Sequence, residues 1–379
     1  MNRFISKGLK RDTCLELAQM TKHQYYHIPV KSGKRGRRAS THASQLMNGA
    51  WQTVLNEVIE TEMRAVDLNP DLKCGAMRMT HHLQLKGFKV NHKKVAAMMK
   101  RMGITGKNKR KSAKRDKKYV EFRVLNPTQP LTHLQMDIKY HWLVRERCQA
   151  YTLTVIDTFT REVLDRFTGY SIRAIEVKDL WGKIIEQHLE PAGRAWSEIA
   201  LVVITDNGPQ FIAELIKEFF ETNGIEHQFT HPYTPEENAY IESFHANMSS
   251  SVEREHFNLE ELKSRLEVFY NNYNQHRTHT STKGLPPVMF RKAWENDLVI
   301  TCFDKKKAVK MKLRHPLYEI PGILSQREHL AKKNRAQRSQ LKRKSGEKTS
   351  SAYNVRTPVN TSPSVASCVA NEVTQFELI

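Results

Sequence analysis

The apolar run Leu201–Thr205 is the feature that most limits what this chain can fold into. Its leucine, valine, isoleucine and threonine side chains are typical of a buried β-strand. Asp206 follows at its end, and Gly208 and Pro209 interrupt the chain before a helical pattern begins. A carboxylate at the end of a buried strand is held in place while it remains open to solvent. Because Asp-Asn-Gly is also common in simple turns, its meaning depends on the residues around it.

A second strand upstream carries another carboxylate. Apolar and polar residues alternate over 134–142, which predicts a half-buried strand with Asp137 on its polar face. Two more strand patterns follow at 151–156 and 162–170, and a helical pattern covers 173–188. Three consecutive strands followed by alternating strands and helices predict an α/β fold, with a mixed sheet and helices on both faces.

The helix after Thr234 carries the third carboxylate. Thr234-Pro235-Glu236-Glu237 fits a capping box, with Thr234 as N-cap and Glu237 closing back on it. We expect this helix to pack beside the strand that ends at Asp206. Four polar residues fall on one of its faces: Asn238, Glu242, His245 and Ser249.

Three carboxylates on two strands and a helix can converge on hard divalent cations, and here they are Asp137, Asp206 and Glu242. Mg²⁺ prefers oxygen ligands and few carboxylates. Two such ions about 3.5–4 Å apart can activate a water or a 3′-hydroxyl and stabilise the leaving oxygen of a phosphodiester. Three other aspartates compete for this role: Asp157, Asp165 and Asp179. Asp157 has the position of a strand-terminating turn residue.

The charge distribution points to an anionic polymer as partner. The net charge is +21, and four stretches together hold more positive charge than this total: 31–38, 107–118, 303–315 and 325–348. The remaining chain is close to neutral, so the basic residues lie in connectors and the tail. This pattern favours a protein that handles DNA.

The N-terminal third predicts three helices, over 43–66, 72–86 and 91–102, with Asn91 as N-cap of the last. A short helix pair with a Gly turn and a basic second helix is typical of a helix-turn-helix. The basic residues expected to contact DNA are Lys93, Lys94, Lys100 and Arg101. The alternative is a helical bundle whose lysines are merely solvated.

No apolar run approaches the about 20 residues that a bilayer span needs, and the sequence after Met1 has no signal-peptide pattern. The five cysteines are scattered and never spaced as Cys-X-X-Cys, so neither a disulfide framework nor a four-ligand zinc site is expected. These observations predict a cytoplasmic protein with reduced thiols.

These motifs resemble a known family. Asp137, Asp206 and Glu242, with 35 residues between the last two, resemble the D,D(35)E triad of retroviral integrases and insertion-sequence transposases. TDNGPQF and HPYTPEENAYIESFH are similar to core motifs of the OrfB-type transposases of bacterial insertion sequences. HHLQLKGFKVNHKKVAAMMKRMGI is similar to their helix-turn-helix segment, and FYNNYNQHRTH to the segment after the core. The resemblance covers roughly residues 40–295.

The resemblance implies a five-stranded RNase H-like sheet with flanking helices, preceded by an all-α helix-turn-helix region. It implies a transposase that cleaves and joins DNA with Mg²⁺ or Mn²⁺, two ions being held by the three carboxylates. The implied partners are the element's terminal repeats and target DNA, bound by a homo-oligomer on the bacterial nucleoid. Asn238, His245 and Arg254 are further candidate DNA contacts.

Three departures from the family pattern keep other functions open. Ser249 stands seven residues after Glu242, where the family usually has Lys or Arg; Leu134 replaces a Trp, and Thr278 replaces the Pro of Arg-Pro-His. The alternatives are a catalytically weakened, transposase-derived DNA-binding regulator and an RNase H-like nuclease without joining activity.

The expected organisation has six parts. They are an N-terminal helix and basic linker (1–42), a helix-turn-helix DNA-binding region (43–106), a basic linker (107–125), an RNase H-like integrase catalytic core (126–295), a small basic module (296–324) and a disordered basic and polar tail (325–379).

Overall fold

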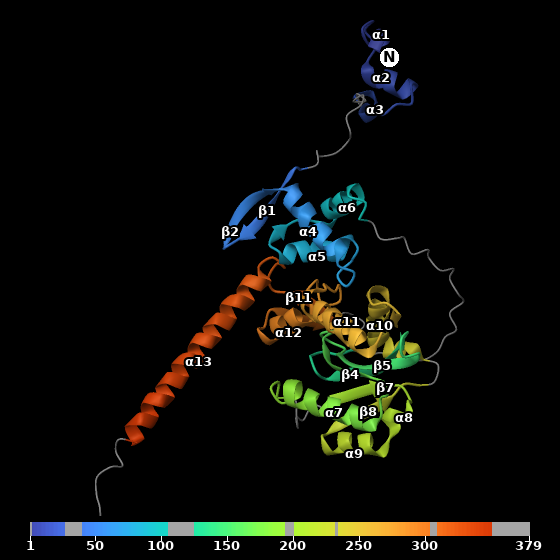
Figure 1. Ribbon diagram of the computed structural model, residues 1–379. Coiled ribbons are helices and arrows are strands. Elements are labelled where there is room, and N and C mark those ends of the chain that lie inside the picture. Colours follow the sequence, from blue (N-terminus) through green and yellow to red (C-terminus); the bar gives the residue numbers. More distant parts are fainter. Residues whose placement is uncertain are drawn as a thin grey trace, which may run out of the picture.

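The computed structural model describes residues 2–26, 40–104, 125–193, 201–231, 234–303 and 309–350 (Figure 1). The two basic stretches predicted at 31–38 and 107–118 lie outside these residues, as does 351–379. The chain begins with three short helices: α1 (Asn2–Ile5), α2 (Arg11–Leu17) and α3 (Lys22–Tyr26).

The region after His42 corrects the sequence prediction of one helix over 43–66. The structure has an antiparallel hairpin of β1 (His42–Met47) and β2 (Ala50–Leu55), followed by α4 (Asn56–Leu68). Asn48 and Gly49 form the turn with φ angles of 51° and 81°. A two-residue type I′ turn needs positive φ at both positions, which Asn-Gly adopts readily. The turn therefore overrides the helical spacing of the apolar residues.

The helix-turn-helix is present as α5 (Ala76–Leu85) and α6 (His92–Arg101). The side chain of Asn91 accepts a hydrogen bond from the Lys94 N–H at 3.0 Å, so it caps α6 as predicted. Between the helices, β3 (Phe88–Lys89) pairs with β1 in a three-stranded sheet ordered β2-β1-β3. The region is therefore helical but not all-α. We refer to residues 42–104 as the helix-turn-helix unit.

The turn between α5 and α6 requires glycine. Gly87 has a φ of +89°, and a Cβ at this position would lie 2.6 Å from the carbonyl oxygen of Leu46 in β1. Any side chain would push the turn off the hairpin. The close approach lets Phe88 enter a buried core with the following residues: Ile59, Met63, Met79, Leu83, Val95 and Met98.

The central sheet has the predicted mixed architecture. Its strands are β4 (His133–Leu143), β5 (Cys148–Asp157), β6 (Val163–Gly169), β7 (Leu201–Thr205) and β8 (Ile225–Phe229). Their order is β6-β5-β4-β7-β8: β4, β5 and β6 are antiparallel neighbours, whereas β7 runs parallel to β4 and β8. A short strand, β9 (Glu255–His256), pairs in parallel with the C-terminal end of β4. The strand that carries Asp137 is therefore central.

Helices cover both faces of this sheet (Figure 1). One face packs against α7 (Ala174–Ile184), its continuation η1 (Ile185–Leu189), α8 (Pro209–Ile212) and α9 (Glu214–Thr222). The other packs against α10 (Ala239–Ser251), α11 (Leu259–Asn271) and the π-helical turn η3 (Asn272–His276). Trp181 and Phe244 anchor the two cores with 0% and 1% exposure. Each such side chain stabilises the fold by roughly 1.5–3 kcal/mol.

The C-terminal part contains α12 (Pro287–Glu295), an antiparallel pair of β10 (Val299–Phe303) and β11 (Val309–Leu313), and α13 (Ile320–Ser350). The sequence predicts disorder from 325 onward, but the structure has a helix as far as Ser350, extending away from the other elements (Figure 1). The composition there is too charged to pack, yet it is rich in residues with high helix propensity. Poor packing does not exclude a helix.

Candidate catalytic site

Asp137 and Asp206 lie on neighbouring parallel strands. In the β4–β7 pairing, Gln135 is the partner of Ile204, two residues before each aspartate. Asp137 lies within β4, and Asp206 follows the last residue of β7. Because the strands run in the same direction from a shared register, the two carboxylates reach the same level of the sheet.

The turn after β7 orients Asp206. Its Oδ1 accepts a hydrogen bond from the Gly208 N–H at 3.1 Å, and the Asn207 side chain donates to the Thr230 carbonyl at 3.3 Å. Partial withdrawal from water raises the pKa of Asp206, the Gly208 N–H lowers it, and the Asp137 charge raises it further. Asp137 is thus close enough to influence its neighbour on β7.

A buried glutamine ties the third element to β4. Gln135 is fully buried; its Oε1 accepts the Ile241 N–H at 3.0 Å, and its Nε2 donates to the Glu237 carbonyl at 2.7 Å. These bonds join the strand two residues before Asp137 to the start of α10, one residue before Glu242. The sequence alone does not single out Gln135, because a glutamine in an alternating strand is expected to face solvent.

Glu242 is exposed on α10 and lies within electrostatic reach of Asp137. Desolvation raises its pKa most, followed by the charges of Asp137 and Glu236, whereas His245 lowers it. Asp137 therefore raises the pKa of both other members of the predicted triad, and it lies between them.

Asn238 lies just before α10 and His245 lies in the middle of this helix. Both are buried, with exposures of 7% each. The Nδ1 of His245 lies 3.2 Å from Oδ2 of Asp137, and Ser249 donates its hydroxyl to the His245 carbonyl at 2.9 Å. Among the described residues, neither the Asn238 Oδ1 nor the His245 Nε2 has a hydrogen-bond partner. Both residues face the protein interior rather than an exposed surface suited to DNA.

The helix begins later than the sequence predicts. Pro235–Asn238 forms a 3₁₀ turn (η2) and α10 begins at Ala239, without a side-chain cap from Thr234. The Thr234 hydroxyl donates to the His231 carbonyl at 2.6 Å, and the Glu237 carboxylate accepts the His231 N–H at 3.0 Å. The predicted capping box is therefore wrong, because both of its side chains bond to the preceding loop.

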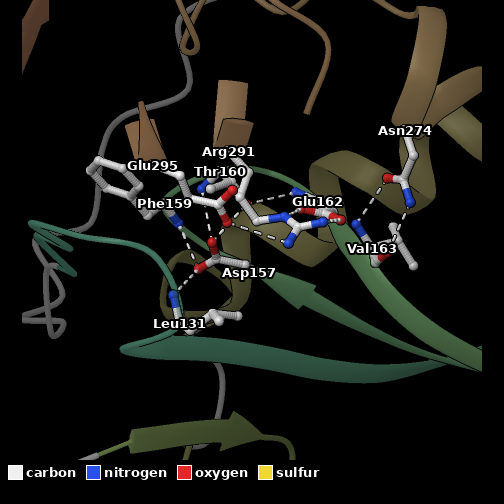
Figure 2. Close-up of polar contacts among 9 residues, drawn as sticks. All are labelled: Leu131, Asp157, Phe159, Thr160, Glu162, Val163, Asn274, Arg291 and Glu295. Carbon is white, nitrogen blue, oxygen red and sulfur yellow. Dashed lines mark hydrogen bonds and ion pairs between the residues drawn. The ribbon is translucent and has the colours of Figure 1, made fainter. Parts of the chain in front are cut away.

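Figure 2 shows why Asp157 does not belong to the site. It is 1% exposed, and its carboxylate accepts backbone N–H groups from Phe159 at 3.2 Å, Thr160 at 3.1 Å and Leu131 at 3.4 Å. Burial raises its pKa, and these donors with the Thr160 hydroxyl oppose the rise. Asp157 is a turn residue, as its position at the end of a strand suggests.

The C-terminal helices are fixed to the same turn region. The Glu162 carboxylate pairs with Arg291 of α12 at 2.6 Å, and the Asn274 side chain exchanges two hydrogen bonds with the backbone of Val163, at 3.0 and 2.8 Å (Figure 2). Asn274 belongs to the FYNNYNQHRTH segment. That segment therefore braces the start of β6.

The basic residues predicted to contact DNA differ in their availability. Lys93 and Lys100 are exposed on α6. Lys94 donates to the His42 carbonyl at 2.7 Å, and Arg101 forms an ion pair with Glu60. Both are therefore already engaged within the helix-turn-helix unit. A further basic residue, exposed between α10 and β9, is Arg254.

The donor chemistry of the site suits a hard cation. Among the residues that the structure describes, no three histidine, cysteine, aspartate or glutamate side chains lie close enough to hold a metal ion. Desolvation raises the pKa values of Asp206 and Glu242 most, and the Asp137 charge adds to the rise in both. A divalent cation relieves such repulsion, and carboxylate oxygens suit Mg²⁺ or Mn²⁺.

No helix in the described part of the chain has both the length and the apolar character needed to cross a membrane.

Comparisons with known proteins give matches to two parts of this chain. Two family models described as "Integrase core domain" match residues 127–235 and 223–287, and one described as "HTH-like domain" matches 59–112. The catalytic core domain of BIV integrase is 19% identical and has a TM-score of 0.31, over 44% of this chain and 97% of that one.

Curated relatives come from bacterial insertion elements. The insertion element IS476 39.2 kDa protein of Xanthomonas euvesicatoria is 27% identical over 70% of this chain and 73% of its own length. The IS407 31.7 kDa protein of Burkholderia multivorans is 26% identical over 62% and 81%, and the transposase of IS904 from Lactococcus lactis is 23% identical over 59% and 91%. The chain thus carries an HTH-like domain followed by an integrase core, and its curated relatives are proteins of bacterial insertion elements, in agreement with the resemblance to OrfB-type transposases.

Proposed function

We propose that this transposase cleaves DNA at the ends of its insertion sequence and joins them to target DNA, with Asp137, Asp206 and Glu242 as ligands of two Mg²⁺ or Mn²⁺ ions. The observation that carries the proposal is the register of β4 and β7, which puts Asp137 and Asp206 at the same level of the sheet, with Gln135 fixing the start of α10 beside them. The Asp137 charge also adds to the raised pKa values of Asp206 and Glu242, and a divalent cation would relieve this repulsion.

The protein's own groups would hold this arrangement in place. Gln135 fixes the start of α10 to β4, the Gly208 N–H orients Asp206, and His245 holds one oxygen of Asp137. When bound, divalent ions would polarise the scissile phosphodiester and stabilise its leaving oxygen. The chain's contribution would be to keep the three carboxylates on the same part of the sheet and its covering helix.

Double-stranded DNA would bind through the exposed basic residues. Lys93 and Lys100 of α6 are available for element ends, and Arg254 is exposed between α10 and β9. Ser249 offers no positive charge, and its hydroxyl is bonded to its own helix. We expect the element ends and target DNA to be held by an oligomer of this chain.

The test is an oligonucleotide assay with the DNA ends that flank the gene, in Mg²⁺ or Mn²⁺. Asp206→Asn should abolish metal-dependent cleavage and joining while leaving DNA binding intact. The control is Asp165→Asn, which removes one carboxylate from β6 of the same sheet, outside the predicted triad. Joining by Asp206→Asn at the level of this control would refute the assignment.

A further inference from the structure

A buried aspartate of the helix-turn-helix unit is bound by residues of the integrase core. Asp71 lies between α4 and α5 and is 2% exposed. Its carboxylate accepts hydrogen bonds from Arg265 at 3.1 Å and from the Asn272 side chain at 2.9 Å, and its carbonyl accepts one from Arg277. A charged side chain is seldom this buried unless it is paired.

The same two arginines also hold α10. Arg265 donates to the carbonyl of Ser251, the last residue of that helix, at 3.0 Å. Arg277 donates to the Asn247 side chain at 2.8 Å. Each arginine thus binds Asp71 with one part of its guanidinium and the C-terminal half of α10 with another. The start of α10 is fixed by Gln135, so the helix that carries Glu242 is held at both ends.

The junction extends along α5. The Thr278 hydroxyl donates to the Arg78 carbonyl at 3.2 Å. Gly284 has a φ of +92°, and a Cβ there would lie 2.6 Å from the ring of His81. The chain after η3 therefore lies directly against α5, which keeps Asp71 in a fixed position relative to the arginines.

Arg277 depends on this environment. It is 4% exposed, and desolvation together with the nearby Arg78 charge lowers its pKa to about 10, while Asp71 acts to raise it. Removing the partner of a buried charge is strongly destabilising locally, because the remaining ion has no compensation. Without the Asp71 charge, we expect the Arg265 guanidinium, which bonds to the carboxylate, to reorient towards water and to release the end of α10. Arg277 keeps its bond to the Asp71 carbonyl but loses the favourable charge nearby.

We propose that Asp71 is a positioning residue for catalysis: it belongs to the DNA-binding unit, and through Arg265 and Arg277 it sets the position of the helix that carries Glu242. The inference rests on the proposed role of Glu242. The position of α10 in the integrase core then depends on Asp71 of the helix-turn-helix unit in the same chain. The FYNNYNQHRTH segment, which supplies Asn272 and Arg277, then serves as the junction between the two parts.

The test compares Asp71→Asn with Asp67→Asn in the full chain. Both variants remove one carboxylate charge from the same unit, but Asp67 lies in a partly exposed pair with Lys73 at 3.3 Å. Two readouts need no catalysis: hydrogen–deuterium exchange of the α10 amides and titration with Mn²⁺ alone. For Asp71→Asn we expect faster exchange at residues 247–251 and an affinity for Mn²⁺ that is about tenfold weaker. Asp67→Asn should match wild type in both.

Unchanged exchange in folded Asp71→Asn would overturn the inference. Should this variant fail to fold, Asn247→Ala removes the hydrogen bond from Arg277 to α10, together with the bond from the Asn247 amide to the Ser243 carbonyl within the same helix. Alanine has the higher helix propensity, which offsets the bond within the helix. Faster exchange at residues 247–251 in Asn247→Ala therefore supports the inference, whereas unchanged exchange overturns it. A wild type that binds no Mn²⁺ would instead refute the metal site, and the exchange data would still decide the role of Asp71.

Discussion

The imidazole of His245 on α10 lies 3.2 Å from the carboxylate of Asp137 on β4. The contact involves Oδ2 of Asp137, whereas Oδ1 accepts the Ile138 N–H at 2.8 Å. Both oxygens of the central carboxylate are therefore restrained, one by its own strand and one by the helix that carries Glu242. In the tautomer with a proton on Nδ1, His245 donates this hydrogen bond.

Replacing His245 by alanine should therefore lower cleavage by about 10- to 100-fold, the usual effect of removing a group that orients a metal ligand. DNA binding should not change, because the side chain is buried. Initial rates of end cleavage at saturating Mn²⁺ measure the effect. Ser249→Ala, which removes only a hydrogen bond within α10, is the control. Equal rates for the two variants would show that His245 does not orient Asp137.

Gln135→Leu should destabilise the core. The substitution keeps a side chain of similar size but leaves the Ile241 N–H and the Glu237 carbonyl unpaired in the interior. Each unpaired buried group costs about 1–3 kcal/mol. Urea denaturation measures the change in unfolding free energy. Gln149→Leu, at an exposed position of β5, should have little effect, and equal midpoints for the two variants would contradict the role of Gln135.

Asp206→Asn should raise stability at neutral pH while it removes the response to metal. The pKa of Asp206 in the folded chain lies above the usual 3.8. The folded state therefore binds a proton more readily than the unfolded state, so this group lowers stability as pH rises from the unfolded to the folded pKa. The Tm of the variant should exceed that of wild type at pH 7, and the difference should vanish in acid below the usual pKa.

Mn²⁺ should raise the Tm of wild type and of Asp165→Asn but not that of Asp206→Asn. A metal stabilises the folded state only where its binding site is intact, and Asp206→Asn lacks one of the proposed ligands. Differential scanning fluorimetry with and without metal gives both comparisons. If wild type had a higher Tm than Asp206→Asn at pH 7 in the presence of a chelator, the proposed repulsion at Asp206 would be contradicted.

Ser249→Lys should strengthen binding to element ends. Ser249 is exposed on α10, and its hydroxyl bonds to the His245 carbonyl of the same helix. A lysine here adds a charge that can reach a phosphate near the proposed site. Gel-shift titrations should give several-fold tighter binding to end DNA, with the gain falling as salt rises. An unchanged affinity would indicate that this position does not face the DNA.

The exposed basic residues of α13 should contribute affinity without sequence preference. Replacing Lys332, Lys333 and Arg335 by glutamine should flatten the dependence of log K on log salt by roughly 0.9 for each phosphate that is no longer neutralised. The control replaces Lys178 and Lys183 of α7 and Lys217 of α9 by glutamine. Fluorescence anisotropy on a random duplex at several salt concentrations separates the two. Equal slopes of log K against log salt for the two triple variants would show that these residues of α13 do not contact DNA.

The sequence predicts those parts of the site that depend on local pattern. The alternation around Asp137 and the apolar run before Asp206 are properties of a few adjacent residues, and both strands form as expected. The hairpin at 42–55 was not predicted because its apolar residues also fit helical spacing, and only the Asn48-Gly49 pair marks the turn. The helices of the helix-turn-helix itself follow from local signals such as the Asn91 cap.

Other features depend on partners that are distant in the chain. Gln135 bonds to groups more than 100 residues away, and Asp71 to side chains almost 200 residues away. No periodicity reveals such pairs, because either residue could equally face water. The predicted capping box at Thr234 is wrong for the same reason. The local pattern is present, but the Glu237 carboxylate accepts a hydrogen bond from the His231 N–H and does not cap the helix.

The parallel pairing of β4 with β7 has a consequence for the life of the protein in the cell. A parallel pair cannot form by a simple hairpin, and its strands are brought together only after the intervening β5, β6 and α7 have been made. Contacts so distant in the chain form slowly during folding. Asp137 and Asp206 therefore meet only in a nearly complete fold. A nascent or partly folded chain therefore does not yet hold the two carboxylates of the proposed metal site together.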